Sequence, residues 1–376
     1  MTVGKRIEGI DSLRGLAALY VLLYHTALIP SPALTIPSWA RSLVMAGGTG
    51  VTLFFVTSAF SLCLAARAGE ERGWALAAFA ARRFFRIAPL YYVVLAVSLL
   101  RDWWLFSVVH SKTEILADIS LLFNLIPGQE TGIVWASWTI GVEVLFYAVF
   151  PFMAARMKSL SHAAVFLMLS LLGAMAYPNL LHLTSLTSAA QASFSNYGVL
   201  HYMPVFVSGM FAYRIFHRFV AGSNTVPIAA GAALLLGAAY FYSLILSGML
   251  PSGFFHDIYY WQAILYCAVI LGVAIYPTGL LVNRVTLNLG TVSYSLYLVH
   301  PLVVYALIPF YRVVEAHAWR PTITFGLCVM VTCLAVTAVA NLTFRFIEAP
   351  GMRIGTRLST YLTSARTSRQ VLGEVS

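Results

Sequence analysis

Two ionisable side chains, Arg14 and His25, lie eleven positions apart in one apolar segment, residues 10–29. At about 3.6 residues per turn a helix carries both on one face, roughly 16 Å apart along its axis. A charge inside lipid is costly and usually marks a polar path or a site. Histidine, whose ordinary pKa is about 6.5, can take a proton from a hydroxyl, and arginine can hold a phosphate or a developing oxyanion. The pair therefore suits group transfer.

A purely structural interpretation of this segment stays open. Asp11 lies three residues before Arg14, close enough on a helix to pair with it and lower the cost of burying it. Arg14 would then extend to the inner headgroups, and His25 would hydrogen-bond a neighbouring carbonyl.

A second group of basic residues precedes the third apolar segment. Arg83 and Arg86 are three positions apart and share a helix face. A cluster of this kind satisfies membrane topology and binds lipid headgroups. It could equally grip the phosphates of a nucleotide-like donor through bidentate hydrogen bonds.

A third group surrounds a carboxylate inside an apolar segment. Glu143 has Tyr147 one turn after it and Trp138 before it. An unpaired carboxylate in lipid is expensive, so we expect Glu143 to face the helix bundle and to be hydrogen-bonded. Its spacing leaves open whether it orients His25, binds substrate or braces helices.

A fourth group ends in a histidine followed by proline. His300 comes immediately before Pro301, and a proline inside a helix frees a carbonyl that local polar groups can satisfy. Packing and hydrogen bonding therefore explain His300 without chemistry. Alternatively, Ser293 and Tyr294 line a cavity together with it.

The composition indicates that these segments lie in a membrane. Of 376 residues, 60% are hydrophobic and 10% charged, whereas soluble proteins carry about 25% charged residues. The formal charge of +10 does not indicate nucleic acid, because basic residues concentrate in alternate connections, as the positive-inside rule requires. These are Lys5 and Arg6, Arg67 to Arg86, Arg156 and Lys158, Arg214 and Arg218, Arg284, and the arginines from Arg345 onward.

Length and charge together predict an all-α, polytopic membrane protein with a bundle of about ten transmembrane helices and both termini in the cytoplasm. The expected spans are about 10–29, 49–66, 87–107, 135–155, 162–183, 199–216, 226–247, 258–276, 291–311 and 322–346. Residues 1–350 form the membrane domain, and residues 351–376 are expected to form a loosely ordered cytoplasmic tail. The four cysteines lie in apolar segments and are interpreted as small buried hydrophobes, so no metal site is expected.

In order along the chain, these segments resemble the acyltransferase-3 family, membrane O-acyltransferases that acylate bacterial surface sugars and some secreted metabolites. The resemblance is carried by Ile10–Leu19 with His25, Gly50–Phe60, Arg83 and Arg86, then Trp138, Glu143 and Tyr147, then Ser293–His300, and Phe346–Pro350.

The resemblance implies a ten-helix bundle that takes an acyl group, usually acetyl, from cytoplasmic acyl-CoA to a hydroxyl at or beyond the outer face. It implies that His25 and Arg14 are essential and that Arg83 and Arg86 serve the donor. We expect His25 to be the general base, with an acyl-histidine relay as a variant, and catalysis to need Arg14 and Glu143. Substrate contacts are expected from Asp11, Trp138, Tyr147, Ser293 and His300.

The implied acceptor is a glycan or glycolipid of the cell envelope, such as lipopolysaccharide or another polysaccharide, and the implied location is the bacterial inner membrane. Acylation of a macrolide-type metabolite is an alternative acceptor chemistry. A transporter or flippase is the main rival, because intramembrane Arg, His and Glu also line transport paths. A structural membrane subunit is a third possibility. Oligomeric state does not follow from the sequence.

Overall fold

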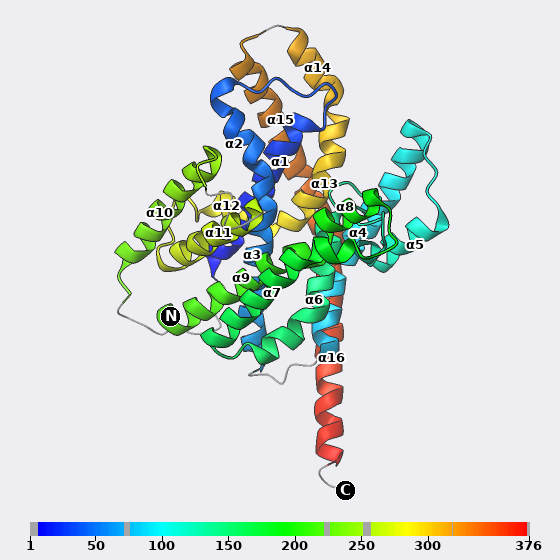
Figure 1. Ribbon diagram of the computed structural model, residues 1–376. Coiled ribbons are helices and arrows are strands. Elements are labelled where there is room, and N and C mark those ends of the chain that lie inside the picture. Colours follow the sequence, from blue (N-terminus) through cyan, green and yellow to red (C-terminus); the bar gives the residue numbers. More distant parts are fainter. Residues whose placement is uncertain (1–6, 71–75, 222–225, 251–256, 318, 374–376) are drawn as a thin grey trace. The chain divides into compact units, whose positions relative to one another are not determined.

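The computed structural model describes residues 7–70, 76–221, 226–250, 257–317 and 319–373, and every regular element among them is a helix (Figure 1). The expected all-α class is therefore confirmed. Three of the basic residues in the predicted charge asymmetry, Lys5, Arg6 and Arg72, lie outside the described residues.

Eight helices of the described part are long and apolar enough to cross a membrane, and a bent pair would make a ninth. They run over Ser38–Ala66, Leu76–Phe106, Trp138–Arg156, Leu160–Leu181, Ser188–Val220, Ile228–Leu246, Ile258–Ile275 and Pro321–Thr363. The expected first span is the helix α1 (Glu8–Leu28), which is not among the eight because its polar side chains, including Asp11, Arg14 and His25, lower its hydropathy. The number ten and the cytoplasmic termini stay predictions.

The ninth expected span, 291–311, is interrupted in the structure, because helices end at Thr291 and at Ala306 within it. Helices α12 (Arg284–Thr291) and α13 (Ser293–Ala306) are bent by 77° where they meet. Asn283 caps α12 by accepting from the backbone N–H groups of Val285 and Thr286, which begins the helix earlier than its hydropathy indicates. Hydropathy records the apolar length of a segment and not a bend within it.

The chain forms two compact units. The first comprises residues 1–61, 159–172 and 202–341, and the second comprises residues 62–158, 173–201 and 342–376. Helices α3 (Gly50–Glu70), α7 (Leu160–Leu181), α9 (Val199–Ile215) and α15 (Pro321–Thr343) contribute to both.

The other elements divide as follows. The first unit also contains α1, η1 (Ser38–Ala40), α2 (Arg41–Met45), η2 (Ala46–Thr49), η4 (Phe216–Val220), α10 (Ile228–Leu246), α11 (Ile258–Ile275), α12, α13 and α14 (Ile308–Ala316). The second also contains α4 (Leu76–Phe106), α5 (Lys112–Ser120), η3 (Phe123–Leu125), α6 (Trp138–Arg156), α8 (Ser188–Tyr197), η5 (Phe344–Glu348) and α16 (Ala349–Gly373).

In the first unit, α1 packs against α11, α12 and α13. Two glycines allow the close approach. A Cβ on Gly15 would lie 2.5 Å from the Gly290 nitrogen, and a Cβ on Gly290 would collide with the Asp11 carbonyl oxygen. The helix that carries Arg14 and His25 is therefore fixed against the junction of α12 and α13.

In the second unit, α16 runs along α4 (Figure 1). Gly351 and Gly355 face α4, where added Cβ atoms would meet Pro89 and Phe85, and Ser359 continues this buried stripe. Where we expected a loosely ordered tail from residue 351, the chain is helical to Gly373. Glycine is a poor helix former in isolation, but here close packing stabilises the helix.

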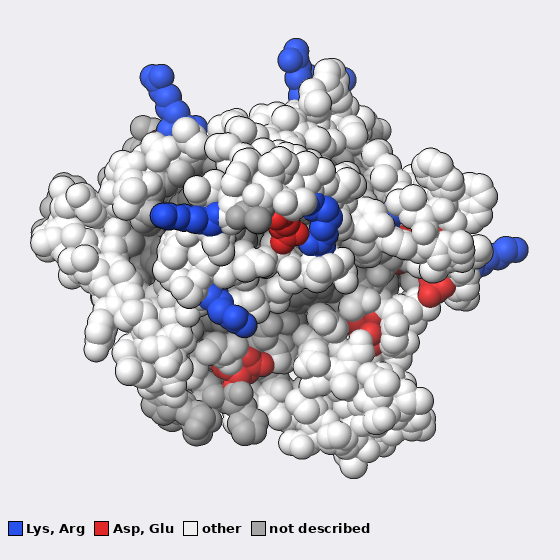
Figure 2. Space-filling model, turned by 90° about the horizontal axis from the view of Figure 1, so that it is seen from above, with Lys and Arg blue, Asp and Glu red and all other residues white. Residues whose placement is uncertain are grey.

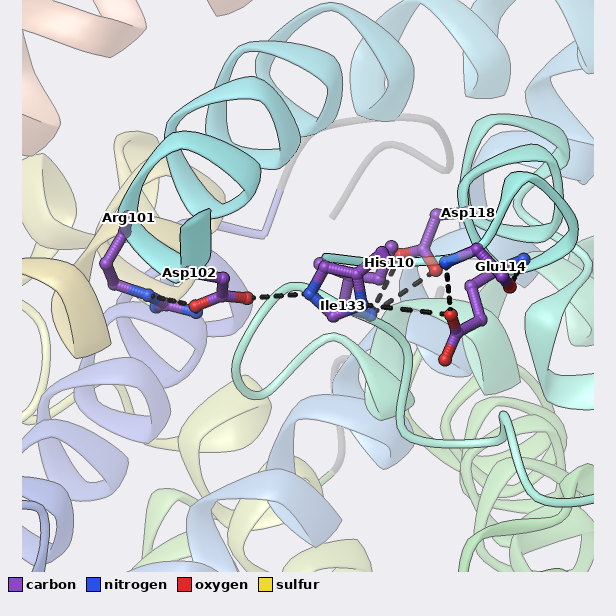
Figure 3. A network of polar contacts seen from close by, with 7 residues as sticks. Arg101, Asp102, His110, Glu114, Asp118 and Ile133 are labelled. Carbon is purple, nitrogen blue, oxygen red and sulfur yellow. Dashed lines mark hydrogen bonds and ion pairs between the residues drawn. The ribbon is translucent and has the colours of Figure 1, made fainter. Parts of the chain in front are cut away.

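A polar network joins the end of α4 to α5 (Figure 3). It consists of Arg101, Asp102, His110 and Glu114, and we call it the His110 network. Arg101 Nε donates to Asp102 at 2.8 Å, and His110 Nε2 lies 3.0 Å from the other oxygen of that carboxylate. His110 Nδ1 lies 4.0 Å from Glu114. The Arg101 guanidinium also lies 3.9 Å from the centroid of the Trp135 ring.

Two carboxyl groups of α5 have opposite environments. The backbone N–H and the hydroxyl of Ser111 hold the pKa of Glu114 below its ordinary value, in a capping box that begins the helix. Burial raises the pKa of Asp118, although the Tyr91 hydroxyl and the Ile133 N–H both donate to it.

Many apolar side chains face outward. Leu236 on α10 is 73% exposed and Leu169 on α7 is 59% exposed, which would be unfavourable in water and suits contact with lipid. On the face seen in Figure 2, charged side chains are few and most of the surface is uncharged. These features support a multi-pass membrane protein.

Candidate functional site

His25 and His300 face each other in the first unit. His25 lies in the last turn of α1, and His300 lies in α13, fully buried. His300 Nε2 is 2.9 Å from His25 Nδ1, and His300 Nδ1 is 2.5 Å from the Tyr297 carbonyl oxygen. Two histidines that the sequence placed in separate groups therefore form one hydrogen-bonded pair.

Arg14 belongs to the same set of contacts. It is 8% exposed, and its guanidinium lies over the Phe54 ring, 5.2 Å from the centroid. The Phe54 ring contacts that of Tyr297, which contacts the ring of His300. A cation over an aromatic face is attracted by the ring quadrupole, which lowers the cost of burying Arg14. The pairing of Arg14 with Asp11 stays a prediction.

Ser293 begins α13 and is fully buried. In the described part of the chain its hydroxyl has no hydrogen-bond partner. Leaving a buried hydroxyl unsatisfied costs about 1–3 kcal/mol. Tyr294, the next residue, is also buried. Ser293 is thus a polar group that a bound hydroxyl or carbonyl could satisfy.

A guanidinium held between two aromatic rings is the main feature of the second unit. Arg83 lies over the rings of Phe79 and Tyr147, at 5.6 and 5.5 Å from their centroids. The Tyr147 hydroxyl donates to Glu143 at 2.6 Å. The Nε of Arg83 is buried and has no hydrogen-bond partner among the described residues. The rings orient the guanidinium while leaving donors for a further acceptor.

Positive charge exceeds negative charge around Arg83. Arg82 precedes it and donates to Ser359 on α16. Arg86 lies one turn later on α4, and Glu143 is the carboxylate that interacts electrostatically with Arg83. Three guanidinium groups and one carboxylate make this half of α4 suited to an anionic ligand.

The comparisons with known proteins identify the family of the chain. A family model described as an acyltransferase domain, that of the acyltransferase-3 family, matches residues 7–341. The chain belongs to the acyltransferase-3 family. Neither the curated proteins nor the solved structures contain a match. Family membership confirms the resemblance and supports a membrane acyltransferase.

The residues predicted from this family divide between the two units. Asp11, Arg14, His25, Ser293 and His300 belong to the first unit, and Arg83, Arg86, Trp138, Glu143 and Tyr147 belong to the second. Within the second unit, Glu143 and Tyr147 contact each other beside Arg83, and Trp138 contacts the ring of Tyr197. Their roles in catalysis stay predictions.

Sequence reasoning missed three features of this acyltransferase. It did not pair His25 with His300, although Pro301 drew attention to the carbonyl that His300 contacts. Phe79, which lies beside Arg83 and one turn earlier on α4, was also missed. The available indication was the spacing, because an aromatic residue four positions before an arginine lies on the same helix face. The bridge from Arg14 through Phe54 to Tyr297 depends on helix packing, which spacing along one segment does not reveal.

Proposed function

We propose that this protein transfers an acyl group, most simply acetyl, from cytoplasmic acyl-CoA to a hydroxyl of a cell-envelope glycan. The observation that carries the proposal is the hydrogen-bonded pair of imidazoles, half-buried His25 and buried His300, in a membrane domain of the acyltransferase-3 family. A histidine is suited to remove a proton from a hydroxyl that attacks a thioester.

In this proposal the donor is held by arginines of α4. The phosphates of acyl-CoA bind Arg83 and Arg86, where bidentate hydrogen bonds match phosphate geometry. Support comes from the buried, unsatisfied Nε of Arg83 and from the excess of guanidinium groups there. Tyr147 and Glu143 keep Arg83 in place and so act as positioning residues.

The chemical step is an acyl transfer with His25 as general base. His25 accepts the proton of the acceptor hydroxyl, and the oxygen attacks the thioester carbonyl. An oxygen–carbon bond forms and the carbon–sulfur bond breaks. The proton on His25 then passes to the thiolate of CoA, so the enzyme returns to its first state. Arg14 stabilises anionic groups of the donor or holds the geometry of the site.

The acceptor is a glycan or glycolipid, and the buried hydroxyl of Ser293 is a candidate contact for it. The location that suits this chemistry is the inner membrane, where cytoplasmic acyl-CoA and envelope precursors both have access.

The activity is tested with the purified full chain in bilayer nanodiscs, radiolabelled acetyl-CoA and an envelope glycolipid extract. Label should pass to the glycolipid fraction, and His25→Ala should lower the rate by at least about 100-fold. The matched control is His317→Ala, which removes an exposed histidine of the same unit. Full activity of His25→Ala would refute the base, and no transfer to any fraction would refute the acyltransferase.

The donor site is tested by CoA-dependent thermal stabilisation, which reports binding alone. Arg83→Ala and Arg86→Ala should each reduce the rise in melting temperature that CoA produces. Arg156→Ala is the control, because this arginine of the same unit also lies over an aromatic ring, Phe152, at 3.5 Å. An unchanged response to CoA in the Arg83 and Arg86 variants would remove them from the donor site.

A further inference from the structure

A proline sets the hydrogen bonds of α13. In an α-helix the N–H of each residue bonds the carbonyl four residues earlier. Pro301 has no N–H, so the carbonyl of Tyr297 has no partner of this kind. The ring of His300 supplies one, because its Nδ1 lies 2.5 Å from the Tyr297 oxygen.

This contact decides the tautomer of His300. A carbonyl oxygen only accepts, so Nδ1 of His300 carries a hydrogen. The ring is fully buried, and among the described residues neither it nor His25 contacts a carboxylate. A buried imidazolium without a carboxylate would be costly, so the ring is neutral. Its Nε2 then has a lone pair and accepts.

The tautomer of His25 follows from that of His300. The two nitrogens 2.9 Å apart, His300 Nε2 and His25 Nδ1, share one hydrogen, which must belong to His25. The other nitrogen of His25, Nε2, is left with its lone pair.

We infer that His300 is a positioning residue that fixes His25 as the Nδ1–H tautomer and makes His25 Nε2 the base. Pro301 is part of the same device, because it frees the carbonyl that orients His300. The inference rests on the proposed acyl transfer and assigns the atom that performs it. The proton of the acceptor hydroxyl moves to Nε2 of His25 and from there to the CoA thiolate. The hydrogen on Nδ1 of His25 stays on that nitrogen and keeps its hydrogen bond to Nε2 of His300.

The arrangement of His25, His300 and the Tyr297 carbonyl resembles a catalytic triad, with one difference. In a triad, a carboxylate accepts from the base and stabilises the imidazolium that forms. Here a neutral imidazole accepts instead, so it selects the tautomer without adding negative charge. His300 therefore determines which nitrogen of His25 reacts. It changes the proton affinity of that nitrogen less than a carboxylate would.

The tautomer can be measured without any activity. In solid-state NMR of protein labelled with nitrogen-15 histidine, the signals that disappear in His25→Gln belong to His25. We expect Nδ1 of His25 to resonate as a protonated nitrogen and Nε2 as an unprotonated one. His300→Ala should produce a mixture of tautomers, and His300→Gln should keep the original one, because its amide oxygen can accept from Nδ1–H. A protonated Nε2 in the unaltered protein overturns the inference.

Kinetics provide the second readout. His300→Ala should lower kcat by about 100-fold, less than the roughly 10⁴-fold loss of a triad whose histidine is held in the wrong tautomer, because the freed His25 ring still samples the active tautomer. KM for acetyl-CoA should stay within about 3-fold. His300→Gln should recover most of kcat, while His317→Gln, the matched control, should resemble the unaltered protein. Equal activity of His300→Ala and the unaltered protein overturns the inference. If the expected tautomer is found but no acyl transfer occurs, the proposed function fails and the inferred tautomer stands.

Discussion

His25 and His110 each contact a second ionisable side chain, but their partners differ in kind. The partner of His25 is the buried imidazole of His300. His110 lies between two carboxylates, at 3.0 Å from Asp102 and 4.0 Å from Glu114 (Figure 3). A carboxylate attracts a charged imidazolium, whereas a neutral imidazole only chooses between tautomers.

These different partners suit the two histidines to different roles. The His110 network ties the end of α4 to α5 through charge, so its contribution is to stability. The His25 pair has no carboxylate in the described part of the chain, so His25 stays available to take up a proton. Substitutions in the His110 network should therefore change stability, and substitutions around His25 should change catalysis.

The largest effect is expected from removing the carboxylate of the His110 network. Asp102→Ala leaves Arg101 with a buried charge and no carboxylate, since both residues are 7% exposed. Loss of one partner of a buried ion pair costs about 3–5 kcal/mol. Thermal unfolding in detergent should show a large drop in stability, while kcat per folded molecule stays unchanged. A fall in kcat with unchanged melting temperature would contradict a stabilising role.

A smaller effect is expected at Pro301, and on catalysis. Pro301→Ala restores an N–H that competes for the Tyr297 carbonyl. Because a carbonyl has two lone pairs, the Tyr297 oxygen can still accept from Nδ1 of His300 beside the new N–H. The orientation of His300, and with it the active tautomer of His25, is therefore weakened but not lost, and kcat should fall by about 3- to 10-fold. Steady-state kinetics on this variant and on Pro178→Ala, a proline in α7, make the comparison. Equal losses in both would point to helix geometry instead.

The cap of α5 should affect stability alone. Ser111 accepts from the Glu114 N–H, and Ser111→Ala should lower stability by about 1 kcal/mol without changing kcat. Thr187→Ala, at the N-cap of α8, serves as the control, because it removes the same kind of cap hydrogen bond away from the His110 network. A larger loss from Ser111→Ala than from Thr187→Ala would show that the network depends on the cap.

The smallest effect concerns pH. Because hydrogen bonds from Ser111 lower the pKa of Glu114, its carboxylate contributes stability above the unfolded-state pKa. That contribution is lost as pH falls through the lower, folded-state pKa. Glu114→Gln should therefore reduce the acid sensitivity of unfolding by a small amount, since the side chain is 41% exposed. Parallel stability curves for the variant and the unaltered protein between neutral and acidic pH would contradict this.

The sequence predicted much of this fold for identifiable reasons. Apolar length located α4, α6, α7, α10 and α11, and polar residues in apolar segments located Arg14, His25, Glu143 and His300. The bend between α12 and α13 was missed because hydropathy does not record direction. The helical form of residues 351–373 was not predicted because the segment is rich in Ser, Thr and Arg, and its composition does not reveal that Gly351 and Gly355 pack against α4.

The site was predicted less completely than the fold. The residue types in each segment indicated proton transfer and anion binding, but contacts between segments depend on how helices are rotated about their axes. His25 and His300 are 275 positions apart, and no spacing rule joins them. Pro301 was the one local indication, because a freed carbonyl requires a donor and His300 is its neighbour.

If His300 affects catalysis only through His25, a double-mutant cycle of the two residues will show it. Rates of acetyl-CoA-dependent transfer are compared for His25→Gln, His300→Ala and the double variant. We expect His300→Ala to slow the unaltered protein by about 100-fold but not to slow His25→Gln further, because the two residues act as a unit. A further slowing of similar size in the His25→Gln background would contradict this.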